Sequence, residues 1–346
     1  MANVHPLIRD FGFWFSRKIG YPLIAPDILQ VSLTYKCNLR CKMCSIMNLP
    51  QQEDELSTNQ VFHVIDEAKI NEIKQILFTG GEPFLRKDIF EICEYSSKQG
   101  LISIVTTNGT LIDEKLAETI SNSKINHIHF SLDGLEEAND FFRGSTVFGK
   151  VIRAIELLNE KRKSNHVFSI GIACIVMNKN VKDLFKVFQL SDTLGVDSIN
   201  FQPLIKDNTN FVNQGDTDFW LGNDDIRILE EEILKIKSFR AKHTIVTQEP
   251  RMELLIKYYQ NGLTKRNWVC FGGFKTVFVC FAKGEPLVYS CHGACGNLDK
   301  TSLRKSWTSK EAYKLRLHSK KCRDLCLQAC YSKESAQSLV NLLKKS

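Results

Sequence analysis

The sequence lacks long hydrophobic runs and a strong excess of charge of either sign. No apolar stretch in its 346 residues reaches the ~18 residues that a membrane-spanning helix needs, and Arg9 and Asp10 fall where a signal peptide would have its apolar core. The net charge of +7 is mild, and no basic stripe interleaved with aromatic residues is present. These absences predict a cytoplasmic protein without a membrane span and argue against nucleic acid as a partner.

The chain also has no internal repeat and no low-complexity segment. Its 43% of hydrophobic and 25% of charged residues are typical of a globular protein, and a chain of this length buries most of its apolar surface without disulfides. Twelve cysteines are nevertheless present. In a reducing compartment, closely spaced cysteines indicate metal ligands before disulfides.

Near the N-terminus, Ile8, Phe11, Phe15 and Ile19 recur at helical spacing within residues 7–24. This pattern predicts a helix that packs under the main domain. The alternative is contact with a membrane surface, in which three basic side chains would lie near the lipid headgroups. These are Arg9, Arg17 and Lys18.

From residue 29 onward, short β-rich runs alternate with amphipathic helical stretches. The predicted strands are residues 29–34, 75–79, 102–107, 127–132, 168–177 and 198–202. The predicted helices lie near residues 57–70, 88–99, 112–121, 147–162 and 180–194. Strict alternation predicts parallel strands with right-handed crossovers, and six such units predict an α/β fold with a partial (β/α)6 barrel of the TIM type.

After residue 204 the pattern changes to a polar, turn-rich stretch and then to helices near residues 224–239 and 250–261. Cysteines become frequent from Cys270 onward. The predicted parts are an N-terminal helical extension (1–28), the partial barrel (29–204), a helical linker region (205–262), a cysteine-rich domain (263–335) and a C-terminal tail (336–346).

The first cysteine group is Cys37, Cys41 and Cys44, a C-x3-C-x2-C spacing that begins where the first predicted strand ends. Thiolates suit iron–sulfur clusters or zinc. A structural zinc ion needs a fourth protein ligand, and the nearest histidine, His63, lies on a separate predicted helix. Three thiolates on a four-iron cluster would leave one iron open for another molecule.

Further motifs stand at the ends of the next strands. Gly80, Gly81 and Glu82 follow the second strand, where a glycine pair lets backbone approach a ligand and a carboxylate can hold an ammonium group. Asn108 ends the third strand, and Ser131 and Asp133 end the fourth. Taken singly, each of these segments is also a common strand-ending turn.

The order and spacing of these motifs across residues 30–204 resemble the radical S-adenosylmethionine (SAM) superfamily. The resemblance implies that the three cysteines hold a [4Fe–4S] cluster, which cleaves SAM reductively to a 5′-deoxyadenosyl radical that abstracts hydrogen from a substrate. Met43 departs from the aromatic residue usual at that position. The resemblance implies SAM contacts at Gly80, Gly81, Glu82, Asn108, Ser131, Asp133 and Arg143, with a surface salt bridge as the alternative role of Arg143.

The C-terminal cysteines resemble the SPASM or twitch extension of radical SAM enzymes, which holds auxiliary [4Fe–4S] clusters. The expected ligands are Cys270, Cys291, Cys322 and Cys326, with Cys330 competing. One auxiliary cluster is preferred, because no cysteine follows residue 330. Two clusters remain possible with Cys280 and Cys295, and structural zinc is the other alternative. Cys93 and Cys174 are isolated and are expected in the core.

The resemblance implies a radical SAM oxidoreductase that draws electrons from a reductant such as flavodoxin or ferredoxin. Its substrate would be a peptide or protein that is crosslinked, epimerised or oxidised. The alternative is a radical dehydrogenase or epimerase acting on a sugar, an alcohol or another small molecule, and a remote one is a non-catalytic metal-binding protein. A leader-binding domain, frequent among peptide-modifying relatives, is expected to be absent or separate. No residue is assigned to catalysis on the substrate itself.

Overall fold

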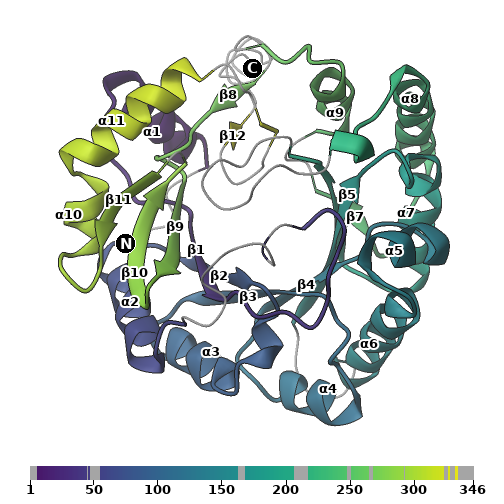
Figure 1. Ribbon diagram of the computed structural model, residues 1–346, viewed down its shortest axis with the longest axis horizontal. Coiled ribbons are helices and arrows are strands. Elements are labelled where there is room, and N and C mark those ends of the chain that lie inside the picture. Colours follow the sequence, from purple (N-terminus) through teal and green to yellow (C-terminus); the bar gives the residue numbers. More distant parts are fainter. Residues whose placement is uncertain are drawn as a thin grey trace.

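The computed structural model describes residues 6–44, 46, 55–162, 168–205, 217–247, 251–264, 268–291, 293–322, 326–327 and 332–333. Across those ranges no helix has the length and apolar character needed to cross a membrane. The strands curve around a centre and most helices surround them on the outside (Figure 1).

All six predicted strands are confirmed, with ends shifted by at most one residue. They are β1 (Ile28–Thr34), β2 (Gln75–Gly80), β3 (Ile102–Thr107), β4 (His127–Ser131), β5 (Ser169–Val176) and β6 (Ser198–Pro203). Each pairs in parallel with the next along the chain. The carboxyl ends of these strands therefore meet at one edge, where sites form in barrels of this type.

The sheet extends beyond the six predicted strands at both edges. β7 (Ile245–Val246) pairs in parallel with β6, and β9 (Thr276–Ala282) pairs in parallel with β1. β10 (Glu285–Ser290) and β11 (Gly293–Asn297) follow as an antiparallel meander. The cysteine-rich region thus begins inside the same ten-stranded sheet, because β1 leaves an open edge that β9 covers. β8 (Val269–Cys270) and β12 (Ser332–Lys333) form a separate antiparallel pair.

Helices cover the outer face of the barrel (Figure 1). They are α2 (Thr58–Ile70), α3 (Ile89–Lys98), α4 (Glu114–Ser121), α5 (Glu136–Arg143), α6 (Val147–Arg162), α7 (Leu184–Thr193), α8 (Asn223–Ser238) and α9 (Met252–Tyr259). Side-chain caps fix two of their starts: Ser57 and Gln60 form a capping box on α2, and Asp113 accepts from the backbone of α4. Helix α5 is the one that the periodicity did not predict.

The N-terminal helix α1 (Pro6–Ile19) is shorter than the predicted 7–24. It ends at Gly20, whose φ of +83° is a left-handed conformation that glycine adopts without strain. α10 (Leu303–Trp307) and α11 (Lys310–Lys321) complete the helices of the C-terminal region. Cys93 and Cys174 are fully buried, as predicted for core residues.

The two faces of the barrel strands differ in chemistry. Side chains that alternate outward, such as Val31, Phe78, Phe130 and Ile172, are buried against the helices in one hydrophobic cluster. The inward positions are largely polar and partly exposed. They include Gln30, Ser32, Thr79, Thr106, His129, Ser131, Ser198, Asn200 and Gln202. The centre of a closed TIM barrel is filled by bulky apolar side chains, so this inner wall is of another kind.

Candidate active site

The glycine pair brings the end of β2 against the end of β1. A Cβ on Gly80 would lie 2.1 Å from the Thr34 carbonyl oxygen, and one on Gly81 would lie 2.1 Å from that of Lys36. Gly81 N–H donates to Thr34 (2.7 Å) and Glu82 N–H donates to Lys36 (2.9 Å). The close approach allowed by these glycines is therefore to the backbone that leads into Cys37, whereas their contact with SAM stays a prediction.

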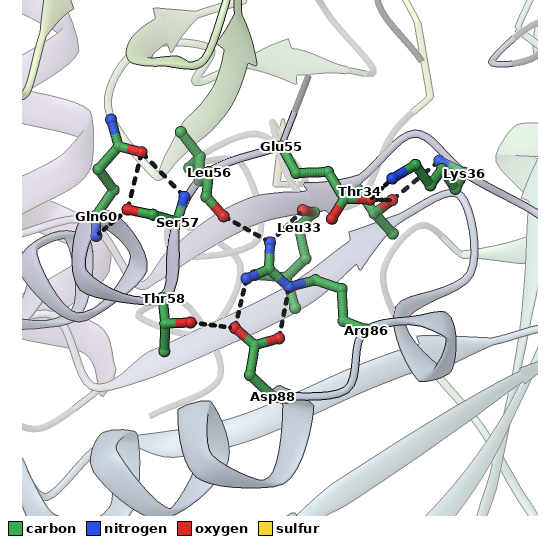
Figure 2. Close-up of polar contacts among 10 residues, drawn as sticks. All are labelled: Leu33, Thr34, Lys36, Glu55, Leu56, Ser57, Thr58, Gln60, Arg86 and Asp88. Carbon is green, nitrogen blue, oxygen red and sulfur yellow. Dashed lines mark hydrogen bonds and ion pairs between the residues drawn. The ribbon is translucent and has the colours of Figure 1, made fainter. Parts of the chain in front are cut away.

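A buried network fixes the same backbone from below (Figure 2). The Arg86 guanidinium donates to the carbonyls of Leu33 (3.0 Å) and Leu56 (2.8 Å) and makes a two-point ion pair with Asp88. Thr58 donates to the same carboxylate at 2.7 Å. Sequence reasoning missed Arg86, because a single arginine after Gly-Gly-Glu-Pro carries no periodic signal.

Cys37, Cys41 and Cys44 lie on the loop that follows β1. The first two are partly buried, and Cys44 is exposed. Burial raises the pKa of Cys37, and burial raises that of Cys41 to about 11 while Arg143 lowers it. The charge of Cys44 raises the pKa of both thiols, and the charge of Cys37 also raises the pKa of Cys41, so the three lie within electrostatic reach of one another. The structure thus brings the predicted trio together.

Hydrogen bonds are directed at the sulfur of Cys37. Leu39 N–H points at it from 3.4 Å and the Asn108 amide from 3.8 Å. Asn108 is held by Asn38 and by its own N–H, which donates to Glu82 Oε2 at 2.7 Å. Donors aimed at a sulfur favour its thiolate form, which is the form that binds iron.

The Glu82 carboxylate is fully buried and accepts hydrogen bonds from within the chain. Thr107 donates to it at 2.8 Å, Asn108 N–H at 2.7 Å and Phe84 N–H at 3.1 Å. Burial raises the pKa of Glu82, and these three donors lower it in part. The side chain expected to hold the SAM ammonium group therefore positions Asn108, and a direct contact between that carboxylate and SAM stays a prediction.

Asp133 and Arg143 form a buried ion pair beside Cys41. Arg143 donates to one carboxylate oxygen through Nε at 2.8 Å and Nη2 at 2.6 Å, and Ile175 N–H donates to the other at 2.7 Å. Burial lowers the pKa of Arg143, but Asp133 and then Cys41 raise it to a net value above the usual one. The pair is no surface salt bridge, and its guanidinium offers positive charge to the thiols.

The unpredicted helix α5 supplies Arg143 and also fixes the cysteine loop. Lys42 N–H donates to the Phe142 carbonyl at 2.8 Å, and the Lys42 ammonium lies 3.6 Å from the centre of the Phe141 ring. Ser131, at the end of β4, is partly exposed on the inner wall. Its contact with SAM stays a prediction.

His129 lies on the inner wall of the barrel below this site. It pairs in register with Thr106 and Gly171, and its ring lies 2.9 Å from where a Gly171 Cβ would be. Burial, and to a smaller extent the charge of the neighbouring His127, lower the pKa of His129 to about 4. A neutral imidazole can both donate and accept a hydrogen bond, so it suits recognition of a polar group in the barrel.

Three of the C-terminal cysteines also converge. Gly272 lies between two of them: a Cβ there would be 3.1 Å from Cys291 Cβ and 3.2 Å from Cys270 Sγ. Burial raises the pKa of Cys270, Gly272 N–H donates to its sulfur at 3.2 Å, and the charge of Cys322 acts on it as well. Cys322 follows directly after α11. The fold therefore gathers residues that are far apart in the sequence.

The remaining cysteines divide into three cases. The Cys326 carbonyl accepts from Trp268 Nε1 at 3.0 Å, so this residue is held near β8. Cys280 is buried in β9 beside Ser32, and Cys295 is buried near Arg316. The predicted ligand Cys330 lies outside the described residues.

The described cysteines have the donor chemistry of an iron–sulfur site. Where the chain is described, no three His, Cys, Asp or Glu side chains form a group that could hold one metal ion. A four-iron cube is larger than one ion and separates its ligands. Soft thiols with backbone and amide donors directed at their sulfurs are the donor set that such cubes use.

Comparison with protein families assigns this site to a class. Residues 31–186, which include every strand-end motif described above, match the model of the radical SAM superfamily. Over these residues the chain is similar to radical SAM enzymes. That similarity implies a [4Fe–4S] cluster and SAM as cofactors.

Two curated relatives show how far the similarity reaches. The AdoMet-dependent heme synthase of Methanosarcina barkeri is 28% identical over 308 residues, covering 84% of this chain and 84% of that protein. The Fe-coproporphyrin III synthase of the same organism is 32% identical over 176 residues, which is 50% of this chain and 43% of that protein. The chain thus spans less than half the length of some relatives that it matches.

Among solved structures, Streptococcus suis SuiB bound to the precursor peptide SuiA has a TM-score of 0.67 at 16% identity. The match covers 90% of this chain and 72% of that chain. Similarity at this identity concerns the fold alone. It confirms the predicted α/β partial barrel with a C-terminal cysteine-rich region resembling SPASM enzymes.

Proposed function

We propose that this enzyme holds a [4Fe–4S] cluster on Cys37, Cys41 and Cys44, cleaves SAM reductively and abstracts hydrogen from a bound substrate. The grouping of these thiols at the carboxyl ends of the parallel strands, between Asn108 and Arg143, carries the proposal. When bound, the cluster and SAM supply the one-electron chemistry, which side chains do not provide. The reductant would be a flavodoxin or ferredoxin, and the compartment the cytoplasm.

The chain's own residues orient the reacting groups. Asn108 and Arg143 stabilise negative charge on the thiolates. The buried Glu82 carboxylate accepts from the Asn108 backbone N–H and the buried Asp133 carboxylate accepts from the Arg143 side chain, so both residues are held in place. For SAM we propose contacts with the strand-end segments that surround the cysteine loop. The full proposed set is Gly80, Gly81, Glu82, Asn108, Ser131, Asp133 and Arg143.

We further propose one auxiliary [4Fe–4S] cluster in the C-terminal region. Cys270, Cys291 and Cys322 support it by their proximity, and Cys326 lies close in sequence to the last of them. Cys330 competes for the fourth position. The buried position of Cys280 beside Ser32, away from this set, argues against a second auxiliary cluster that uses it.

For the substrate we propose a small molecule with polar groups. The heme synthase match over most of both chains supports this class, and the polar inner wall offers hydrogen-bonding partners such as His129 and Asn200. A peptide or protein substrate, to be crosslinked, epimerised or oxidised, is the second candidate. It is favoured by SuiB, a protein of the same fold that binds a precursor peptide.

Anaerobic reconstitution followed by iron and sulfide analysis tests the proposal. We expect a brown protein with about eight irons, four for each cluster, that releases 5′-deoxyadenosine from SAM only when a reductant is added. Deuterated iron porphyrins and deuterated peptides should then be compared as donors of label to 5′-deoxyadenosine. Protein that carries zinc alone after reconstitution would contradict the proposal and leave a non-catalytic metal-binding protein.

A further inference from the structure

Helix α1 turns large apolar side chains outward. Ile8, Phe11, Trp14, Phe15 and Ile19 are 63%, 57%, 38%, 40% and 45% exposed. At 3.6 residues per turn these positions fall within roughly 140° of the helix circumference. They form one continuous face, here called the outer face of α1. Contiguous exposed apolar surface of this kind marks an interaction site more often than isolated exposed residues do.

The opposite side of α1 is bound to the rest of the protein through polar groups. Arg9 pairs with Asp27, and Arg17 Nε donates to the Cys270 carbonyl at 2.7 Å. Phe13, on the same side, is buried with Phe271. An ordinary surface helix places its apolar side on the core and its charges in water. Helix α1 is reversed in this respect, and its inner contacts hold the outer face away from the core.

Basic side chains lie within the outer face and on the helix beside α1. Lys18 lies within its arc, with its ammonium 5.3 Å from the centre of the Trp14 ring. Helix α11 runs beside α1 (Figure 1): Lys320 donates to the Lys18 carbonyl at 3.0 Å, and the Tyr313 ring lies 3.0 Å from where a Gly20 Cβ would be. The exposed basic positions of α11 are Lys310, Lys314, His318 and Lys321, against one exposed acidic position, Glu311.

We propose that the outer face of α1 binds the surface of an anionic lipid bilayer, with the basic side chains of α1 and α11 at the headgroups. Aromatic and aliphatic side chains that enter the interface, with lysines around them, are the pattern of helices that lie in the plane of a membrane. Anionic lipid attracts basic residues that lie near its surface. The inference is independent of the substrate and of the proposed function.

A second copy of the chain is the competing occupant, and charge argues against it. A symmetric dimer places the same patch of each copy against the other, so the basic side chains of the two copies would face each other. Like charges held together in this way oppose association. An anionic surface instead pairs with both features of the outer face, its apolar residues and its lysines.

Co-sedimentation of the full-length, cluster-loaded protein with vesicles tests the inference. We expect binding to vesicles of equal phosphatidylcholine and phosphatidylglycerol, weak binding to phosphatidylcholine alone, and loss of binding in high salt. The Phe11→Ser/Phe15→Ser variant should lower the partition coefficient by about ten-fold or more. The matched control is Ile70→Ser/Leu234→Ser, at exposed positions on α2 and α8, and it should bind as the parent does.

Iron content and circular dichroism establish that each variant is folded, and all four substituted side chains are exposed, so no core contact is lost. Two outcomes would overturn the inference. One is equal vesicle binding by the parent and the Phe11→Ser/Phe15→Ser variant. The other is a parent protein that ignores anionic vesicles and forms a dimer which this variant dissociates, because the outer face would then bind a second copy. Neither outcome bears on SAM cleavage, which is measured separately.

Discussion

The two cysteine regions are built in opposite ways. Cys37, Cys41 and Cys44 lie on one short loop, and the ends of parallel strands and the helix α5 surround that loop with charged and amide side chains. In the C-terminal region, Cys270 lies in β8, Cys291 follows β10 and Cys322 follows α11. Cys270 and Cys291 flank Gly272, and Cys322 lies within electrostatic reach of Cys270. The first site depends on a local spacing, whereas the second depends on the packing of its whole region.

The two cysteine regions should therefore respond differently to single substitutions. The first loop follows a strand whose end is fixed by backbone hydrogen bonds and by Arg86, so small changes there displace all three cysteines together. In the second region each cysteine is held by its own element, so a single change displaces one ligand. The predictions below test this difference, beginning with the largest effect.

The largest expected difference is between Cys41→Ala and Cys326→Ala. The first should abolish SAM cleavage, because the trio has no spare ligand on its loop, whereas the second should retain part of it. Reductant-dependent release of 5′-deoxyadenosine is the measurement, and Cys93→Ala, a core position, is the control that should keep cleavage. Equal loss in the first two variants would show that the auxiliary site is required for folding or for the radical step.

Gly81→Ala tests whether the first loop depends on a backbone approach. Its Cβ would lie 2.1 Å from the Lys36 carbonyl oxygen, and backbone cannot move aside cheaply. We expect a loss of about 3 kcal/mol in the free energy of unfolding, with lower iron content. Anaerobic denaturation in urea measures the first quantity.

Two other Gly→Ala variants serve as comparisons for Gly81→Ala. Gly149 in α6 has nothing within 4 Å of its Cβ position, so Gly149→Ala should be neutral or stabilise by up to about 1 kcal/mol. Gly296→Ala would meet Ser306 Oγ at 2.0 Å in the C-terminal region. It should destabilise that region while SAM cleavage persists. Loss of SAM cleavage in the Gly296→Ala variant would contradict the proposed difference between the two cysteine regions.

Arg86→Lys tests the network below the first loop at a smaller scale. A lysine keeps the charge but loses the fork that reaches two carbonyls and both oxygens of Asp88. The free energy of unfolding should fall by about 2 kcal/mol. Arg153→Lys, where an exposed arginine lies near three glutamates, should change it by less than about 0.5 kcal/mol. Similar changes in the free energy of unfolding for the two variants would show that Arg86 does not position the first loop.

The last prediction has the smallest effect at neutral pH, and this effect grows as the pH falls. The pKa of His129 is about 4 in the folded chain, below the ~6.5 of an unfolded histidine, so protonation favours the unfolded state. Its contribution to stability is present above pH ~6.5 and is lost as pH falls toward 4, by up to about 3 kcal/mol. His129→Gln should flatten this loss in urea denaturation between pH 7 and 4. His318→Gln, at an exposed position on α11, should leave it unchanged.

The sequence alone was sufficient for the barrel. Alternating β-rich and amphipathic segments located all six strands, because strand and helix periods are local properties that survive without tertiary contacts. The C-x3-C-x2-C spacing and the strand-end motifs were sufficient to recognise the similarity to the radical SAM superfamily. Helix α5 was not predicted because it is only eight residues long and rich in charged residues. Helix α1 ends earlier than predicted, before a glycine.

Tertiary structure decided what those residues do for one another. It placed the carboxylates of Glu82 and Asp133 inside the protein as supports for Asn108 and Arg143, added β9 to the open edge of β1, and turned the aromatic side of α1 outward. None of this follows from local pattern, because a buried hydrogen bond depends on partners that lie far apart in the chain. Spacing along the chain therefore identified the cysteine loop, and only the folded protein showed what supports it.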